Sequence, residues 1–482
     1  MRRLSNSSLS QVHAGVLTPA YDRASAQVGV VHFGPGAFHR AHQAFYFDQM
    51  LARRPGFGVC AVSLRSDAVR QALEPQDGLY ALVEKAAQPR VRVIGALLEV
   101  ATAPRDPAAV LRRLVDPRVR IVTATVTEKG YCLTPEGDLD LAHPDVRRDL
   151  GEAAPVSFVG WVLAGLRARR AAGTAPFTSL SCDNLSGNGA RLKRAVLQLA
   201  QARGETELVG WMEAEARFPN TMVDSITPAT DEALRTAAAE ALGLQDAWPI
   251  QRERFVQWVV EDLPAAEADA FAEAGVTLTS DVAAFERAKL RILNGAHSTL
   301  AYVGLRMGHG TVAEAMSDAR LAAFVERLMR QDAAASLTPA AGLDLTAYVG
   351  EVLARFRNPA IEHRLSQIAW DGSQKLPFRI LETAAEALAA GRPLRRLAVP
   401  LAAWMLFVRQ RARSGDDLVD PLANELLAVG RAAGESACAD VAKFLGLSSV
   451  FRRELAAAEP FVAAVRDAYA ALDADPYQAL EA

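Results

Sequence analysis

The chain has 482 residues, of which half are hydrophobic and 23% are charged, and its formal net charge is −3. This composition predicts a soluble, two-domain globular protein and gives no reason to expect nucleic acid as a partner or a membrane-spanning segment. The four cysteines are scattered without a Cys-x-x-Cys pair, which predicts reduced thiols in the cytoplasm and neither disulfides nor a structural zinc.

In the first half of the chain, short β-rich runs alternate with helical segments. The candidate strands are residues 28–33, 58–64, 91–98, 121–126 and 177–181. This alternation predicts an α/β domain with a parallel sheet that binds ligands at the carboxyl ends of its strands. From about Phe285 helical patterns dominate to the end. We therefore expect an α/β domain over residues 1–283 and a mainly α-helical domain over residues 284–482.

The first candidate strand runs into the glycine-containing turn VGVVHFGPGAFHRAH. Gly34 and Gly36 suit the tight turn and the close approach to a pyrophosphate of a dinucleotide-binding loop, but His39 stands where a third glycine is usual. From the glycines alone, a cofactor loop and a simple strand-to-helix turn remain equally open. His39 and His42 have a spacing that can ligate zinc. Since no acidic residue or cysteine lies at ligand spacing nearby, we expect no metal.

A second pattern of polar residues lies in FERAKLRILNGAHSTLAYVG. On an α-helix, at about 100° per residue, Lys289, Asn294 and His297 fall on one side. A lysine among apolar neighbours could exchange a proton with a substrate oxygen near neutral pH, because burial lowers its pKa. The segment alone still favours a solvated lysine, a helix-bending asparagine and a packed histidine.

A third pattern, SCDNLSGNG, directly follows a candidate strand. Its loop position is typical of active-site groups, so Asn184 and Asn188 are candidates for binding a substrate. Both could instead be turn formers, which is the commoner role of asparagine beside glycine. Asp183 could likewise be an N-cap.

Several segments together resemble a known family. They are GPGAFHRAHQAFY, TVTEKGYC, SCDNLSGNG, FPNTMVD, VQWVVED, KLRILNGAHSTLAYVG and DGSQKLP. In this order they resemble the polyol-specific long-chain dehydrogenases, the mannitol dehydrogenase family, over nearly the whole chain. The resemblance implies a metal-independent, nicotinamide-dependent secondary alcohol dehydrogenase, active as a monomer. Its N-terminal domain would be Rossmann-like, its C-terminal domain mainly helical, and its substrate would bind between them.

The resemblance also implies roles for individual residues. Lys289 resembles the catalytic acid/base, Asn184 and Asn294 the pair that binds the reacting oxygen, and His297 the histidine that positions the substrate. Glu128 resembles a glutamate that relays protons to the lysine, and Asp224 and Lys375 resemble substrate-binding residues. The residues implied for the cofactor are Gly34, Gly36, Ala37, Phe38, His39, Arg65 and Asp67. Since Asp67 can accept the ribose hydroxyls we expect NAD, although Arg65 leaves NADP open.

One departure from the family pattern bears on the substrate, a small sugar acid or polyol. Members of the mannitol type carry an arginine eight residues before the lysine equivalent to Lys375, where this chain has Gln367. We therefore expect reduction of a keto-hexuronate such as D-fructuronate to D-mannonate, with mannitol 2-dehydrogenase and tagaturonate reductase as alternatives. A uronate needs a cation for its carboxylate, for which Arg364, ahead of Arg379, is the candidate. A nucleotide-binding regulator without catalysis would have no need of Lys289 and its partners.

Overall fold

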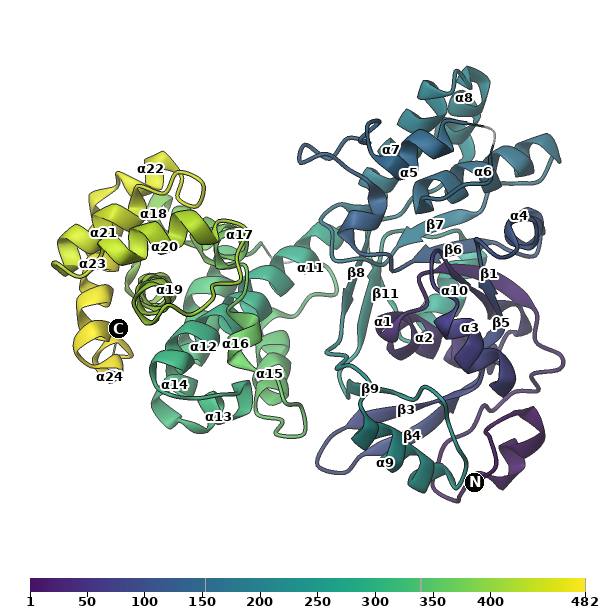
Figure 1. The fold of residues 1–482 in the computed structure, drawn as a ribbon, viewed down its shortest axis with the longest axis horizontal. Helices are drawn as coiled ribbons and strands as arrows, with labels where there is room; N and C mark the ends of the chain where they lie inside the picture. The colour runs from purple at the N-terminus through teal and green to yellow at the C-terminus, as the bar shows by residue number, and fades with distance from the viewer. Residues whose placement is uncertain (152, 339, 482) are drawn as a thin grey trace. The chain divides into compact units, whose positions relative to one another are not determined.

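The chain folds as two units, Met1–Ala283 and Ala284–Ala482, which are described separately. The computed structural model describes residues 1–151, 153–338 and 340–481 (Figure 1). Helix α11 (Val282–Ala288) contains the boundary between the units. Among the described residues, no helix is long and apolar enough to cross a membrane.

A five-stranded, wholly parallel sheet forms the centre of the first unit, in the order β5-β2-β1-β6-β7. Its strands are β1 (Val28–Phe33), β2 (Gly58–Ser63), β5 (Leu97–Thr102), β6 (Ile121–Ala124) and β7 (Thr178–Ser181). All six residues of β1 are buried, as expected of a strand whose two faces are both covered by helices. The chain order reverses between β1 and β6. Ligands of such sheets bind beside the carboxyl ends of the strands at this switch point.

Helices pack on both faces of this sheet (Figure 1). Successive residues of β1 point to opposite faces, so Val30 and Val31 belong to different cores. The Val31 core contains Trp161, and the Val30 core contains Trp258 and Phe47. The helices of the first unit are η1 (Asn6–Gln11), α1 (Ala37–Ala41), α2 (Gln43–Leu51), η2 (Pro55–Phe57), α3 (Ala68–Leu73), η3 (Glu74–Gln76), α4 (Pro107–Val115), η4 (Glu128–Tyr131), α5 (Pro144–Asp149), α6 (Phe158–Ala171), α7 (Asn188–Ala202), α8 (Thr206–Glu215), α9 (Glu232–Leu242) and α10 (Ala265–Glu273).

Two smaller sheets complete the first unit, and one of them corrects a sequence prediction. Their orders are β4-β3-β9 and β11-β10-β8. Their strands are β3 (Tyr80–Lys85), β4 (Arg90–Ile94), β8 (Thr221–Asp224), β9 (Ile250–Glu253), β10 (Gln257–Val260) and β11 (Thr277–Leu278). The strand expected at 91–98 is wrong as one element, because β4 and β5 belong to different sheets. The break falls at Gly95, where a Cβ would lie 2.7 Å from the Pro19 side chain.

The described residues of the second unit beyond α11 contain helices and no strand. The helices are η5 (Lys289–Asn294), α12 (Gly295–Arg306), α13 (Val312–Ser317), α14 (Ala319–Arg327), η6 (Leu328–Ala333), η7 (Ala334–Ser336), α15 (Leu345–Phe356), α16 (Leu365–Ile368), α17 (Gly372–Leu376), η8 (Pro377–Leu381), α18 (Glu382–Ala389), α19 (Arg395–Ser414), α20 (Ala423–Ala432), α21 (Ala437–Leu445), α22 (Arg453–Ala456), α23 (Glu459–Ala474) and α24 (Pro476–Ala479). The long helix α19 packs against α12, α20 and α23 and carries the buried Trp404. Segments η5, η6 and η8 are π-helical.

Candidate active site

The turn after β1 contains two glycines whose backbone conformations and surroundings differ. Gly34 has φ +83°, and a Cβ on it would lie 2.3 Å from the Thr125 carbonyl oxygen. Gly36 is exposed with φ −71°, and the nearest atom to an added Cβ is 3.9 Å away. Gly34 therefore shapes the turn against the loop after β6. Gly36 leaves open space beside the backbone, which fits the close approach of a pyrophosphate.

The side chain of His39 lies in the interior of the first unit. Its ring is fully buried and stacks on the ring of His32, with 3.3 Å between the ring centroids. Burial holds the pKa of His39 well below the ordinary value, so the ring is neutral. His42 lies apart from this stack, with Nε2 2.8 Å from the Gln257 carbonyl oxygen. The two histidines are therefore packing residues of the turn, and a cofactor contact of His39 would involve its backbone.

Arg65 and Asp67, which follow β2 and were expected to contact the cofactor, already have protein partners. The Asp67 carboxylate accepts two hydrogen bonds from Arg70, at 2.7 and 2.6 Å, and one from Thr102 Oγ1 at 2.5 Å. The hydrogen bonds from Arg70 and Thr102 hold the pKa of Asp67 well below its usual range. Arg65 is exposed and forms an ion pair with Asp145 at 2.9 Å. Asp67 is therefore ionised, and a ribose would share it with Arg70.

The half-buried carboxylate of Asp183, which the sequence left as a possible N-cap, connects the loops after β6 and β7. Asp183 accepts hydrogen bonds from the backbone N–H groups of Val126 and Thr127, at 3.0 and 2.9 Å, and from Tyr131 Oη at 2.8 Å. The N-cap of α7 is instead Gly187. Within this connected pair of loops, Glu128 and Asn184 are both exposed.

The two asparagines of SCDNLSGNG differ in environment. Asn188 is buried, and its Nδ2 donates to the carbonyl oxygens of Ser181 at 3.1 Å and Thr221 at 2.9 Å. Asn188 is therefore a structural residue that joins β7 to β8, whereas Asn184 lies at the surface of the loop. Asp224, at the end of β8, is 5% exposed and lies opposite Gln257 in the sheet register.

In the second unit, Lys289 and Asn294 are the first and last residues of a π-helical segment. The α-helical angles expected from the sequence are therefore wrong over these residues. A π-helix closes i→i+5 hydrogen bonds, which brings residues five apart onto neighbouring positions of successive turns, and such segments are frequent at functional sites. Both side chains are half-buried. The π geometry thus aligns Lys289 with Asn294 better than the expected α-helix would.

His297 follows on α12 and is buried, at 8% exposure. Burial first, and then the neighbouring His363, Arg355 and Arg379, hold its pKa well below the ordinary value. The ring is therefore neutral. Among the described residues, the buried Nε2 atom has no hydrogen-bond partner, so it can bind a hydroxyl group.

Arg379 lies on the π-helical segment η8, which packs against η5. Its guanidinium donates to Ser298 Oγ at 3.1 Å, and burial lowers its pKa to about 10, so it is charged at neutral pH. In the described part of the chain, no carboxylate lies within 4.0 Å of this guanidinium. Arg364, by contrast, is exposed and forms an ion pair with Glu362 at 2.9 Å. Arg379 and Arg364 thus differ in burial and in ion pairing, although the sequence made both candidates for a substrate carboxylate.

Lys375 adds a second cation on the same stretch of the second unit. Its Nζ donates to the Trp370 carbonyl oxygen at 2.6 Å and lies 3.8 Å from Asp371. Burial and then the charge of Arg379 lower the pKa of Lys375. Gln367, which stands in place of the arginine of the mannitol type, is exposed.

Both units match models of one protein family. Residues 28–270 match the mannitol dehydrogenase Rossmann domain, and residues 281–473 match the mannitol dehydrogenase C-terminal domain. The chain belongs to the mannitol dehydrogenase family. This confirms the family and the fold class expected from the sequence, an α/β Rossmann-like domain followed by a mainly helical one. The members of the family are oxidoreductases that act on secondary alcohols.

Curated relatives and a solved structure of the family align along almost the whole chain. The uncharacterized oxidoreductase YeiQ of Escherichia coli is 41% identical over 95% of this chain and 94% of its own. The D-mannonate oxidoreductase of Escherichia coli is 39% identical over 94% of this chain and 95% of its own. The Pseudomonas fluorescens mannitol 2-dehydrogenase, solved in a ternary complex with NAD and D-mannitol, is 35% identical, covers 99% of both chains and gives a TM-score of 0.80.

Proposed function

We propose that this protein is an NAD(H)-dependent oxidoreductase that reduces a keto-hexuronate, D-fructuronate, to D-mannonate with no metal ion taking part in the reaction. The observation that carries the choice of a sugar acid is Arg379, a half-buried cation beside His297 with no carboxylate partner among the described residues. The relative named D-mannonate oxidoreductase supports the same choice. In the proposed reaction the ketone carbon gains a hydride and its oxygen gains a proton.

For the proton, the proposal assigns the leading role to Lys289. Its ammonium group donates a proton to the ketone oxygen as negative charge develops there, and Glu128 relays a proton to restore it. The side-chain amides of Asn184 and Asn294 donate hydrogen bonds to the same oxygen, which gives the electrostatic stabilisation that a zinc ion provides in other dehydrogenases. His297, held neutral by burial, binds a substrate hydroxyl through Nε2, and Asp224 and Lys375 bind other hydroxyls.

For the cofactor, we propose that residues 1–283 bind NAD(H) and that residues 284–482 supply the acid/base. The turn at Gly34 and the open space at Gly36 fit a pyrophosphate approached by the backbone of Ala37 and Phe38. The ionised Asp67 favours NAD over NADP because it repels a 2′-phosphate. The bound dihydronicotinamide would supply the hydride.

For the substrate, the ketone of fructuronate lies next to the terminal carbinol, at the opposite end of the molecule from the carboxylate. A cation that binds the carboxylate would therefore fix the position of the substrate so that its ketone lies beside Lys289. We propose that Arg379 has this role, because a bidentate guanidinium matches a carboxylate in charge and shape.

A second candidate activity is the interconversion of D-mannitol and D-fructose. The 35% identity to the mannitol 2-dehydrogenase that binds NAD and D-mannitol favours it. In that case Gln367 would be a tolerated replacement of the arginine of the mannitol type. Tagaturonate, also a keto-hexuronate, would use the same cation as fructuronate.

The experiment that separates these activities compares Arg379→Ala with the exposed control Arg364→Ala. A hydrogen bond to a charged group contributes about 1.5–3 kcal/mol, so Arg379→Ala should lower kcat/KM for fructuronate by about 10- to 150-fold. The same variant should affect fructose far less, and Arg364→Ala should affect neither substrate. Equal losses of kcat/KM for fructuronate and fructose in Arg379→Ala would contradict the proposed carboxylate contact.

A further inference from the structure

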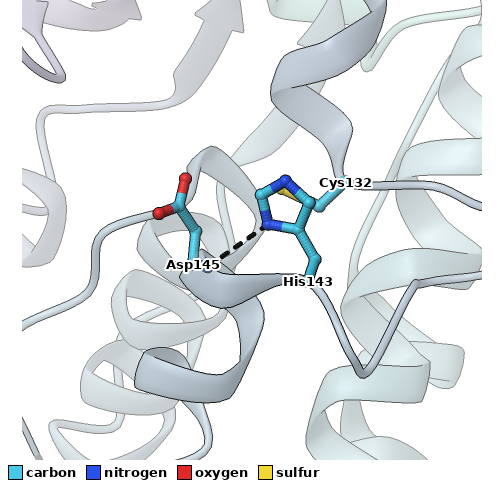
Figure 2. Close-up of side chains that lie close together, drawn as sticks. All are labelled: Cys132, His143 and Asp145. Atoms are coloured by element: carbon cyan, nitrogen blue, oxygen red, sulfur yellow. Dashed lines mark hydrogen bonds between the residues drawn. The ribbon is translucent and has the colours of Figure 1, made fainter.

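Three potential metal ligands that have no assigned role in the reaction converge in the first unit (Figure 2). Cys132 directly follows η4, His143 is the N-cap of α5, and Asp145 lies in the first turn of that helix. One ligand atom from each residue lies within 4.8 Å of the others. The sequence did not predict this cluster, because the cysteine is brought to the two α5 residues by the fold rather than by a local spacing motif.

A cysteine, a histidine and an aspartate could also form a nucleophilic triad, but two observations argue against it. The Asp145 backbone N–H, not its carboxylate, contacts His143 Nδ1, at 3.2 Å, so the aspartate does not orient the ring as in a triad. Burial, and then the charges of Asp145 and Asp149, raise the pKa of Cys132 to about 11. The thiol is therefore a poor nucleophile in surroundings that favour a cation.

We propose that Cys132, His143 and Asp145 bind a zinc ion, with water as the fourth ligand. Zinc accepts this mixture of sulfur, nitrogen and oxygen donors, and three protein ligands with one open position are common for it. Bond lengths of about 2.0–2.3 Å require tetrahedral ligand atoms about 3.3–3.7 Å apart. The ligand atoms now lie within 4.8 Å of one another, so side-chain rotation has to shorten the largest of these distances by about 1 Å to reach this geometry.

Binding replaces two existing interactions and releases a proton. His143 gives up the hydrogen bond from the Asp145 backbone, and Asp145 gives up its ion pair with Arg65, whose side chain is 82% exposed. Both interactions are individually weak compared with a zinc–ligand bond. The Cys132 thiol loses its proton to solvent and binds as the thiolate.

The test uses the full-length protein, treated with EDTA, desalted, and titrated with Co²⁺ as a spectroscopic probe and then with Zn²⁺ as a competitor. Wild type should bind one Co²⁺ per chain with a thiolate-to-cobalt charge-transfer band that Zn²⁺ abolishes. Cys132→Ser should lose the band and bind Zn²⁺ at least about 100-fold more weakly, since even indirect ligand contacts are worth 10- to 100-fold, roughly. The exposed cysteine gives the matched control, and Cys438→Ser should bind as wild type does.

Two further variants keep the test decisive if Cys132→Ser does not fold. Asp145→Asn removes a ligand and should weaken Zn²⁺ binding, whereas Arg65→Ala removes the competing cation and should strengthen it. Opposite changes in these two variants support the site. The absence of a charge-transfer band in wild type, or unchanged affinity in both Asp145→Asn and Arg65→Ala, would overturn it.

Discussion

The two glycines of the turn after β1 should respond differently to the addition of one methyl group. Gly34→Ala forces a side chain into a left-handed backbone and toward the Thr125 carbonyl oxygen, 2.3 Å from the new Cβ. Gly36→Ala meets no protein atom closer than 3.9 Å and has an ordinary φ of −71°. If Gly36 leaves room for a pyrophosphate, its methyl should interfere with the cofactor and not with folding.

These contacts give the expected magnitudes. For Gly34→Ala, a left-handed residue costs about 1–2 kcal/mol and overpacking adds about 1–3 kcal/mol, so the free energy of unfolding should fall by about 2–5 kcal/mol. For Gly36→Ala, the gain of about 0.4–1 kcal/mol from a stiffer unfolded chain offsets most of the cost of a poorer N-cap. The dissociation constant for NADH should instead rise at least about tenfold, which corresponds to roughly 1.4 kcal/mol.

Urea unfolding and fluorescence titration with NADH measure the two quantities independently. The expected pattern is a destabilised Gly34→Ala and a stable Gly36→Ala that binds NADH weakly. A Gly36→Ala protein that is as stable as wild type and binds NADH equally well would refute the assignment of this turn to the cofactor.

Three further predictions concern catalysis, cofactor choice and pH. Lys289→Ala should lower kcat by at least about 100-fold while NADH still binds. The control Lys443→Ala removes a lysine of α21 that has no proposed role in the reaction and should keep wild-type kcat. Near wild-type turnover of Lys289→Ala would exclude Lys289 as the acid/base. Asp67→Ala removes a carboxylate and exposes Arg70 to a 2′-phosphate, so the ratio of kcat/KM for NADH over NADPH should fall; equal wild-type values for both cofactors would contradict its role. Burial lowers the pKa of His32 from 6.5 to about 3 in the folded protein. As the pH falls, the unfolded state therefore binds a proton at a higher pH than the folded state does, and stability is lost between pH 6.5 and 3. By pH 5 the contribution of His32 to this loss is about 2 kcal/mol, and the buried His39 and His297 add losses of the same sign. In urea unfolding, the loss between pH 7 and pH 5 should therefore be about 2 kcal/mol smaller in His32→Gln than in wild type and in the exposed control His13→Gln.

The central sheet and the glycine turn were predictable from the sequence because their signals are local. Four of the five expected strands are present as single elements, and Gly34 has the left-handed φ that a tight turn requires. The run at 91–98 was misjudged because an apolar stretch interrupted by Gly95 can serve two sheets, and sequence periodicity does not say which strands pair. The expected change to helices after about Phe285 is confirmed, because the described residues beyond α11 form helices and no strand.

The details of the site depend on contacts that sequence spacing does not encode. The segment from Lys289 to Asn294 is π-helical and packs against η8, and no residue type in that segment signals the π geometry. The sequence cannot distinguish Arg364 from Arg379, because both are arginines of the same segment. The structure distinguishes them, since Arg379 is half-buried whereas Arg364 is exposed and ion-paired. Cys132 meets His143 through a turn of the chain between them, so the cluster has no recognisable motif.

The most direct measurement is a comparison of wild-type kcat/KM for D-fructuronate, D-tagaturonate and D-fructose, followed by the oxidation of NADH. The proposed function predicts the highest value with fructuronate, because Arg379 can contribute a charged hydrogen bond only to a substrate with a carboxylate. A higher kcat/KM with fructose than with fructuronate would contradict the account and identify the protein as a mannitol 2-dehydrogenase.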